Sequence, residues 1–174
     1  MRLVLLALLS VCFFITSCKG DKVSEVILET QEQIDAKTIS QKDIASIRYD
    51  DFGLSTDSQK AVNDWQKFQD LKIQVELLKK GDLIYFSGDP LIIQTLLQEL
   101  RTEMPVKLQT NEISARITAL DTKTQKLNSL LTITNIDKDE KIQAIKEFLI
   151  TASNLNLQIN KKFEFEKNNV LQPE

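Results

Sequence analysis

Two long stretches in the second half of the chain share one apolar spacing, and this spacing restricts the fold more than any other feature. In each stretch the spaced residues alternate steps of four and three positions, which places them along one face of an α-helix. They are Ile113, Ile117, Leu120, Thr124, Leu127 and Leu131 in the first, and Ile142, Ile145, Leu149, Ala152, Asn156, Ile159 and Phe163 in the second. Because only a short turn over residues 131–137 separates them, the two helices are predicted to pair as an antiparallel hairpin.

One position on the second stripe allows two arrangements. Asn156 falls on the predicted core face, where a buried amide fixes the register of a helix pair at some cost in stability, here opposite Arg116. Alternatively, Leu155 takes the core position and Asn156 lies at the edge of the stripe. We favour the second arrangement, and both keep the hairpin.

A third helix is predicted upstream, over residues 55–80. Ser55 or Asp57 can cap its first turn, and Gly81 supplies a left-handed stop after its last. Its apolar residues recur every three or four positions, as expected of a helix with one buried face. They are Val62, Trp65, Phe68, Leu71, Val75 and Leu78.

A fourth helix is predicted to begin at Asp89-Pro90. Asp89 can accept a hydrogen bond as the N-cap, and a proline in the first turn costs nothing there because its missing N–H would be unpaired anyway. Pro105 ends this helix. The chain is therefore predicted to be all-α: an antiparallel bundle of about four helices over residues 55–165, a polar N-terminal spacer, and a frayed tail over residues 166–174.

The segments between the helices contain turn formers and aromatic residues. Residues 49–55 are predicted to form a loop held against apolar surface by Tyr49 and Phe52, after a short helix around residues 40–47. Residues 81–89 form a second long connection, whose apolar patch can lie on the helix ends. Acidic residues in and after the first loop offer the oxygen ligands that Ca²⁺ favours, but they lack the alternation of an EF-hand and predict no metal site. These are Asp50, Asp51 and Asp57.

The N-terminus has the order of a signal peptide. A positive charge at Arg2 precedes an apolar run, residues 3–15, of roughly 13 residues, shorter than the ~20 that a helix needs to cross a bilayer. The run ends in Ile15-Thr16-Ser17-Cys18, which resembles the lipobox of bacterial lipoproteins. That resemblance implies removal of residues 1–17, lipid attachment to the thiol of Cys18, and a tether over residues 18–54. The alternative is a secreted chain in which Cys18 stays a free thiol.

Five short segments of the remaining chain carry a second resemblance. They are Asp64-Trp65-Gln66-Lys67, Leu78-Lys79-Lys80-Gly81-Asp82, Leu100-Arg101-Thr102-Glu103-Met104-Pro105, Arg116-Ile117-Thr118-Ala119-Leu120 and Leu155-Asn156-Leu157-Gln158-Ile159-Asn160. In these segments the chain resembles uncharacterised helical lipoproteins of marine Bacteroidota. The resemblance implies a helical fold and an address in the cell envelope, at the outer membrane, and it implies no particular activity.

The residue content argues against an enzyme. The chain has no histidine, and Cys12 and Cys18 are its only cysteines, one lost with the signal and one acylated. No catalytic residues and no cofactor are therefore predicted. The formal net charge of −3 gives no reason to expect nucleic acid as a partner.

The partners predicted are the lipid bilayer, through acylated Cys18, and another envelope protein, bound by a helical interaction or scaffold module. The alternative function is a small-molecule carrier that holds an apolar ligand between its helices, with the connection over residues 81–89 as a gate. The two functions predict different structures. A carrier needs a closed apolar cavity of a few hundred Å³, whereas an interaction module has a filled core and an exposed apolar patch.

Overall fold

The computed structural model describes residues 38–169. The predicted signal peptide, Cys18, the first part of the tether and the end of the tail lie outside these residues, so their assignments stay predictions.

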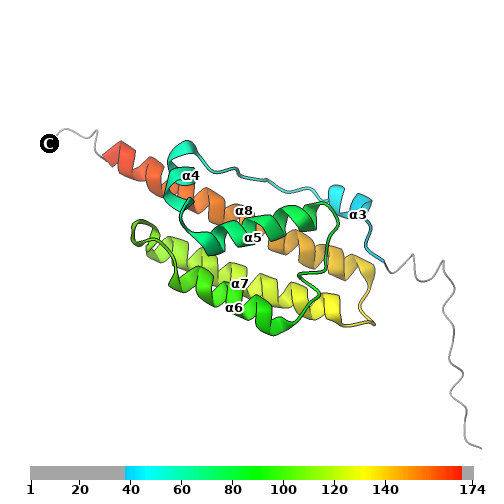
Figure 1. Cartoon of the computed structure of the whole chain (residues 1–174). Coiled ribbons are helices and arrows are strands. Elements are labelled where there is room, and N and C mark those ends of the chain that lie inside the picture. Colours follow the sequence, from blue (N-terminus) through cyan, green and yellow to red (C-terminus); the bar gives the residue numbers. More distant parts are fainter. Residues whose placement is uncertain (1–37, 170–174) are drawn as a thin grey trace, which may run out of the picture. The chain divides into compact units, whose positions relative to one another are not determined.

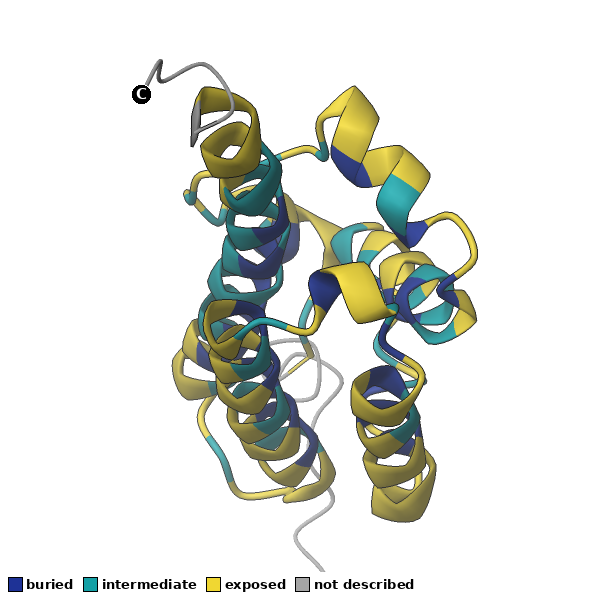
Figure 2. Ribbon diagram, turned by 90° about the vertical axis from the view of Figure 1, so that its left-hand side faces the viewer, coloured by how far each residue is buried: buried dark blue, intermediate teal, exposed yellow. Residues whose placement is uncertain are grey.

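Within residues 38–169 all regular structure is helical, as the sequence predicts. Four long helices, α5 to α8, run in alternating directions and form the antiparallel bundle, with α3 and α4 as short helices on its outside (Figure 1). Buried residues lie on the inner faces of the helices and exposed residues on the outer faces (Figure 2). The helices are α3 (Gln41–Ala45), α4 (Thr56–Val62), α5 (Gln66–Lys79), α6 (Pro90–Thr102), α7 (Asn111–Thr132) and α8 (Lys138–Asn169), with a 3₁₀ turn at Val106–Leu108.

The α7–α8 hairpin has the predicted seam. Five of the six spaced residues of α7, including Thr124, are buried. On α8, Leu155 takes the core position and Asn156 lies at the edge, which confirms the favoured arrangement. The hairpin is also held by Glu147, whose carboxylate accepts from the Nζ atoms of Lys123 at 2.9 Å and Lys126 at 3.0 Å. Hydrogen bonds from Lys123 and then Lys126 lower the pKa of Glu147 to about 2.

The prediction of one continuous helix over residues 55–80 is wrong, because the structure has two. α4 ends at Val62 and α5 begins at Gln66, and Asn63 and Asp64, which favour turns over helix interiors, occupy the break. The break lets Trp65 lie fully buried and stack on Phe68, with 5.2 Å between ring centroids.

The caps of these helices follow simple rules. Ser55, and not Asp57, caps α4, because its side chain accepts from the N–H of Ser58. Gly81 follows the end of α5 with a φ of +96°, the left-handed conformation predicted for its stop. Asp89 caps α6 and Pro90 opens it, again as predicted.

The connection over residues 81–89 is part of the core. Phe86 is fully buried and packs on Phe148 of α8, with 4.7 Å between ring centroids. The buried side chain of Asn128 on α7 donates from Nδ2 to the carbonyl oxygens of Phe86 at 2.9 Å and Gly88 at 3.0 Å. These contacts fasten the connection to α7 and α8, which does not suit it to open as a gate.

The last helix is longer than the predicted bundle. α8 continues through Asn169, so residues 166–169, which were predicted to be frayed, are helical. An ion pair four residues apart, Lys162 with Glu166 at 2.7 Å, supports this extension.

Candidate functional site

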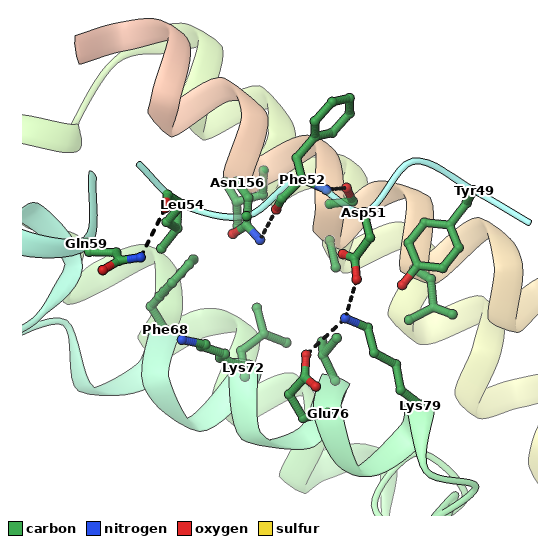
Figure 3. Close-up of a pocket in the computed structure, with 17 residues that line it drawn as sticks. Tyr49, Asp51, Phe52, Leu54, Gln59, Phe68, Lys72, Glu76, Lys79 and Asn156 are labelled. Atoms are coloured by element: carbon green, nitrogen blue, oxygen red, sulfur yellow. Dashed lines mark hydrogen bonds and ion pairs between the residues drawn. The ribbon is translucent and has the colours of Figure 1, made fainter. Parts of the chain in front are cut away.

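An extended segment, residues 49–55, crosses the outside of the bundle and is here called the strap. It has no regular structure of its own, and a row of three polar side chains on α8 binds its backbone. Figure 3 shows one of these contacts, from Asn156 to Phe52. These side chains recur at spacings of three and four, so all of them lie on one face of α8. They are Ser153, Asn156 and Asn160, here called the polar row.

The polar row pairs with the strap much as a neighbouring β-strand would. The Ser153 hydroxyl donates to the carbonyl of Asp50 at 2.6 Å and accepts from the N–H of Phe52 at 2.8 Å. Asn156 Nδ2 donates to the carbonyl of Phe52 at 3.0 Å. Asn160 donates to the carbonyl of Gly53 at 2.8 Å and accepts from the N–H of Ser55 at 2.8 Å.

The polar row also corrects two expectations about this region. Tyr49 packs against the core, as predicted, and so does Leu54. The ring of Phe52, which was predicted to hold the loop against apolar surface, points away from α5 (Figure 3). The main-chain N–H and carbonyl of Phe52 hold the strap instead, through their hydrogen bonds to α8. Asn156 finds its partner in the strap instead of at Arg116.

A pocket of about 290 Å³ lies beneath the strap, between α5 and α8. Its floor is apolar, and its rim carries the charged groups of α5 and the strap (Figure 3). The floor residues include Phe68, Leu71, Val75, Leu149, Ala152 and Leu155, and the rim residues include Tyr49, Asp51, Lys72, Glu76 and Lys79.

Lys79 is the centre of the charged rim. Its Nζ lies 2.7 Å from the carboxylate of Asp51 on the strap and 2.9 Å from that of Glu76. Burial acts to lower the pKa of Lys79, but the hydrogen bonds to Asp51 and Glu76 outweigh it and hold the pKa above its ordinary value. Burial also raises the pKa of the neighbouring Tyr49. Lys79 therefore stays charged near neutral pH, where it ties the strap to α5 and does not act as a base.

The acidic residues weighed as metal ligands do not form a site. Asp51 is paired with Lys79, Asp50 contributes its main-chain carbonyl to Ser153, and Asp57 lies in the first turn of α4. Nowhere in residues 38–169 is a group of three or more His, Cys, Asp or Glu side chains arranged to hold a metal ion.

We predict that Ser153→Ala loosens the strap. Removing the hydroxyl leaves the Phe52 N–H and the Asp50 carbonyl without their partner, which should lower the free energy of unfolding by about 1 to 3 kcal/mol. Hydrogen exchange should become faster at the amides of Phe52 and Ser55 and stay unchanged in α7. The matched control is Thr151→Ala, because the Thr151 hydroxyl bonds only to the Glu147 carbonyl within α8. Equal exchange at Phe52 in both variants would contradict this role.

A second surface feature is an apolar patch where α5 connects to α6. Three large aliphatic side chains there are mostly exposed: Ile84 at 79%, Leu91 at 66% and Ile92 at 59%. Beside them an open groove of about 490 Å³ runs between α5 and α6 and contains Tyr85 and Leu96. Such clustered aliphatic surface is unusual on an isolated monomer and is typical of a binding surface.

Comparisons with known proteins identify no relative, because no protein-family model, no curated protein and no solved structure matches the chain. No helix within residues 38–169 is both long enough and apolar enough to cross a membrane. The strap pocket and the apolar patch are therefore the two features of the described body from which a function can be argued.

Proposed function

We propose that this chain is a lipoprotein of the bacterial cell envelope, anchored through acylated Cys18, whose helical body is a non-enzymatic interaction module. The sequence Ile15-Thr16-Ser17-Cys18 after a short apolar run supports the anchor. An outer-membrane address follows from the resemblance to Bacteroidota lipoproteins and belongs to the same proposal.

The observation that carries the interaction role is the contrast between the core and the surface. The centre of the bundle is filled by fully buried large side chains, among them Trp65, Phe86 and Phe148. Several large apolar side chains remain exposed on the surface, and three of them, Ile84, Leu91 and Ile92, lie where α5 connects to α6. Binding at such a surface suits a scaffold or interaction module better than a carrier.

The strap pocket favours the carrier function. Its volume of about 290 Å³ and its apolar floor fit a small ligand. However, it is an open pocket under the strap with charged residues on its rim, and an apolar ligand there would remain partly in water. The carrier function is therefore the second candidate.

The anchor is tested by Cys18→Ser in the full chain expressed in a bacterium with lipoprotein processing. We expect an uncut precursor that incorporates no labelled palmitate. The matched control is Cys12→Ser, which changes the other cysteine inside the apolar run and should be processed and acylated normally. Normal cleavage and acylation of the Cys18→Ser protein would refute the anchor.

A further inference from the structure

We infer that the envelope component bound by the apolar patch is the lipid bilayer itself. One end of the helical body then contacts the membrane surface. This inference builds on the proposed anchor at Cys18 and names the partner of the proposed interaction surface. The contact surface, here called the apolar end, consists of Ile84, Leu91, Ile92 and Ile133.

The fold brings these four side chains to one end of the bundle from separate elements. Ile84 lies in the α5–α6 connection, Leu91 and Ile92 in the first turn of α6, and Ile133 just after α7. Asn128 fastens the connection to the last turns of α7 through the carbonyls of Phe86 and Gly88. Pro90 and Thr132 line one small hollow, which places the start of α6 beside the end of α7.

The described chain also enters the bundle at this end. α3 lies against the start of the α5–α6 connection. The Cβ atom of Gln41 is so close to Gly81 that a Cβ atom added to this glycine would lie only 3.2 Å from it. α3 is also joined to the first residue of α8, since Asp43 accepts from Lys138 at 2.8 Å. In Figure 1, α3, the α5–α6 connection and the α7–α8 turn lie together, and the α6–α7 connection lies at the opposite end.

The length of chain before α3 allows this end to reach the bilayer. Roughly 20 residues separate Cys18 from the first described residue, and even a fully extended chain spans at most about 3.3 to 3.6 Å per residue, or ~70 Å here. An acylated Cys18 would thus keep the end at which the described chain enters the bundle within ~70 Å of the membrane surface. Tethering at a surface raises the effective concentration for a second, weaker contact with that surface.

The chemistry of the apolar end suits lipid better than a protein partner. Its exposed groups are aliphatic, whereas the energetic centres of protein interfaces are enriched in Trp, Tyr and Arg. Two acidic side chains of the α5–α6 connection are hydrogen-bonded to the local backbone: Asp82 accepts from the N–H of Ile84 and Asp89 from the N–H of Leu91, each at 2.9 Å. Aliphatic side chains beside a lipid anchor add to membrane affinity in proportion to the apolar area they bury.

The test places a fluorescent probe at each end of the full lipidated protein. If Cys12 leaves with the signal and Cys18 is acylated, a new cysteine is the only free thiol, so Ile84→Cys and Val106→Cys can each be labelled with an environment-sensitive dye. The two sites are matched controls, because Ile84 is 79% exposed and Val106, in the opposite connection, is 83% exposed. Each protein is reconstituted into phosphatidylcholine vesicles with and without nitroxide-labelled lipid.

We expect the dye at position 84 to shift to the blue and to be quenched severalfold more by nitroxide lipid than the dye at position 106. Equal, weak quenching at both sites in protein that floats with the vesicles would overturn the inference while leaving the anchor intact. A blue shift at position 84 in native envelopes but not in pure lipid would also overturn it, in favour of a protein partner. Failure of the anchor would look different, because the protein would not float with the vesicles and Cys18 would itself take up dye.

Discussion

Phe148→Ala is expected to lower the free energy of unfolding by about 3 to 5 kcal/mol, the usual cost of truncating a large core aromatic. Phe148 is fully buried on α8, and its ring packs on that of Phe86 from the α5–α6 connection. Truncation removes this contact and leaves a cavity between α8 and the α5–α6 connection. Urea unfolding followed by far-UV circular dichroism measures the change.

The matched control is Phe165→Ala on the same helix. Phe165 is 67% exposed, whereas Phe148 is 0% exposed, so the same change of residue removes little buried area at position 165. The control should alter the free energy of unfolding by no more than about 0.5 kcal/mol, as is usual for surface substitutions. Similar losses for both variants would mean that α8 does not pack on the α5–α6 connection through Phe148.

The α7–α8 hairpin could be predicted because its signal is local and long. The alternating steps from Ile113 to Leu127 and from Ile145 to Ile159 repeat over several turns, and only a helix with one buried face satisfies all of them at once. Helix ends could also be predicted where a single type of residue determines where the helix begins or stops. Asp89-Pro90 and Gly81 are examples, since their conformations are set by their own chemistry.

The break between α4 and α5 could not be predicted from the same spacing. Val62, Trp65 and Phe68 fit a continuous stripe, and Asn63 and Asp64 are tolerated on the exposed side of many helices. The break is decided by tertiary packing, which buries Trp65 completely. At the break the carbonyl of Val62 accepts from the N–H of Trp65 at 3.1 Å and from the side chain of Gln69 at 2.7 Å.

The strap and its polar row were missed for a related reason. Phe52 and Ser153 are 101 positions apart, and a hydrogen bond between a side chain and a distant backbone leaves no periodic signal. The available clue was the recurrence of uncharged polar residues at 153, 156 and 160 along one face of the helix. Such a row indicates that one face pairs with polar backbone, although it does not tell which segment supplies that backbone.

Asn128→Asp is expected to be strongly destabilising at neutral pH, although it changes only an amide NH₂ into an oxygen. Asn128 is buried and donates to two carbonyl oxygens, those of Phe86 and Gly88. An ionised aspartate would place a negative charge against these two acceptors with no donor to offer. An uncompensated buried charge of this kind typically costs about 3 to 5 kcal/mol, and it should release the α5–α6 connection from α7.

The free energy of unfolding of Asn128→Asp should fall as pH rises. Burial and the two carbonyls would hold the pKa of the new carboxyl above the ordinary aspartate value of about 3.9 in the folded state. Below pH 3.9 the group is protonated in both states, and one O–H can still donate to one of the two carbonyls. As pH rises above 3.9 the unfolded state loses its proton first, so the stability of the variant falls until the folded-state pKa is passed.

The measurement is therefore urea unfolding of Asn128→Asp and of the unaltered protein at several pH values between 3.5 and 8. The quantity compared is the difference between their free energies of unfolding at each pH. The matched control is Asn135→Asp, an identical change at an exposed position in the α7–α8 turn, which should show a small difference that varies little with pH. A difference for Asn128→Asp that stays constant across this range, or one that shrinks as pH rises, would contradict the geometry. Since Asn128 holds the connection that carries Ile84, the same substitution should also abolish any preferential quenching of a dye placed at position 84.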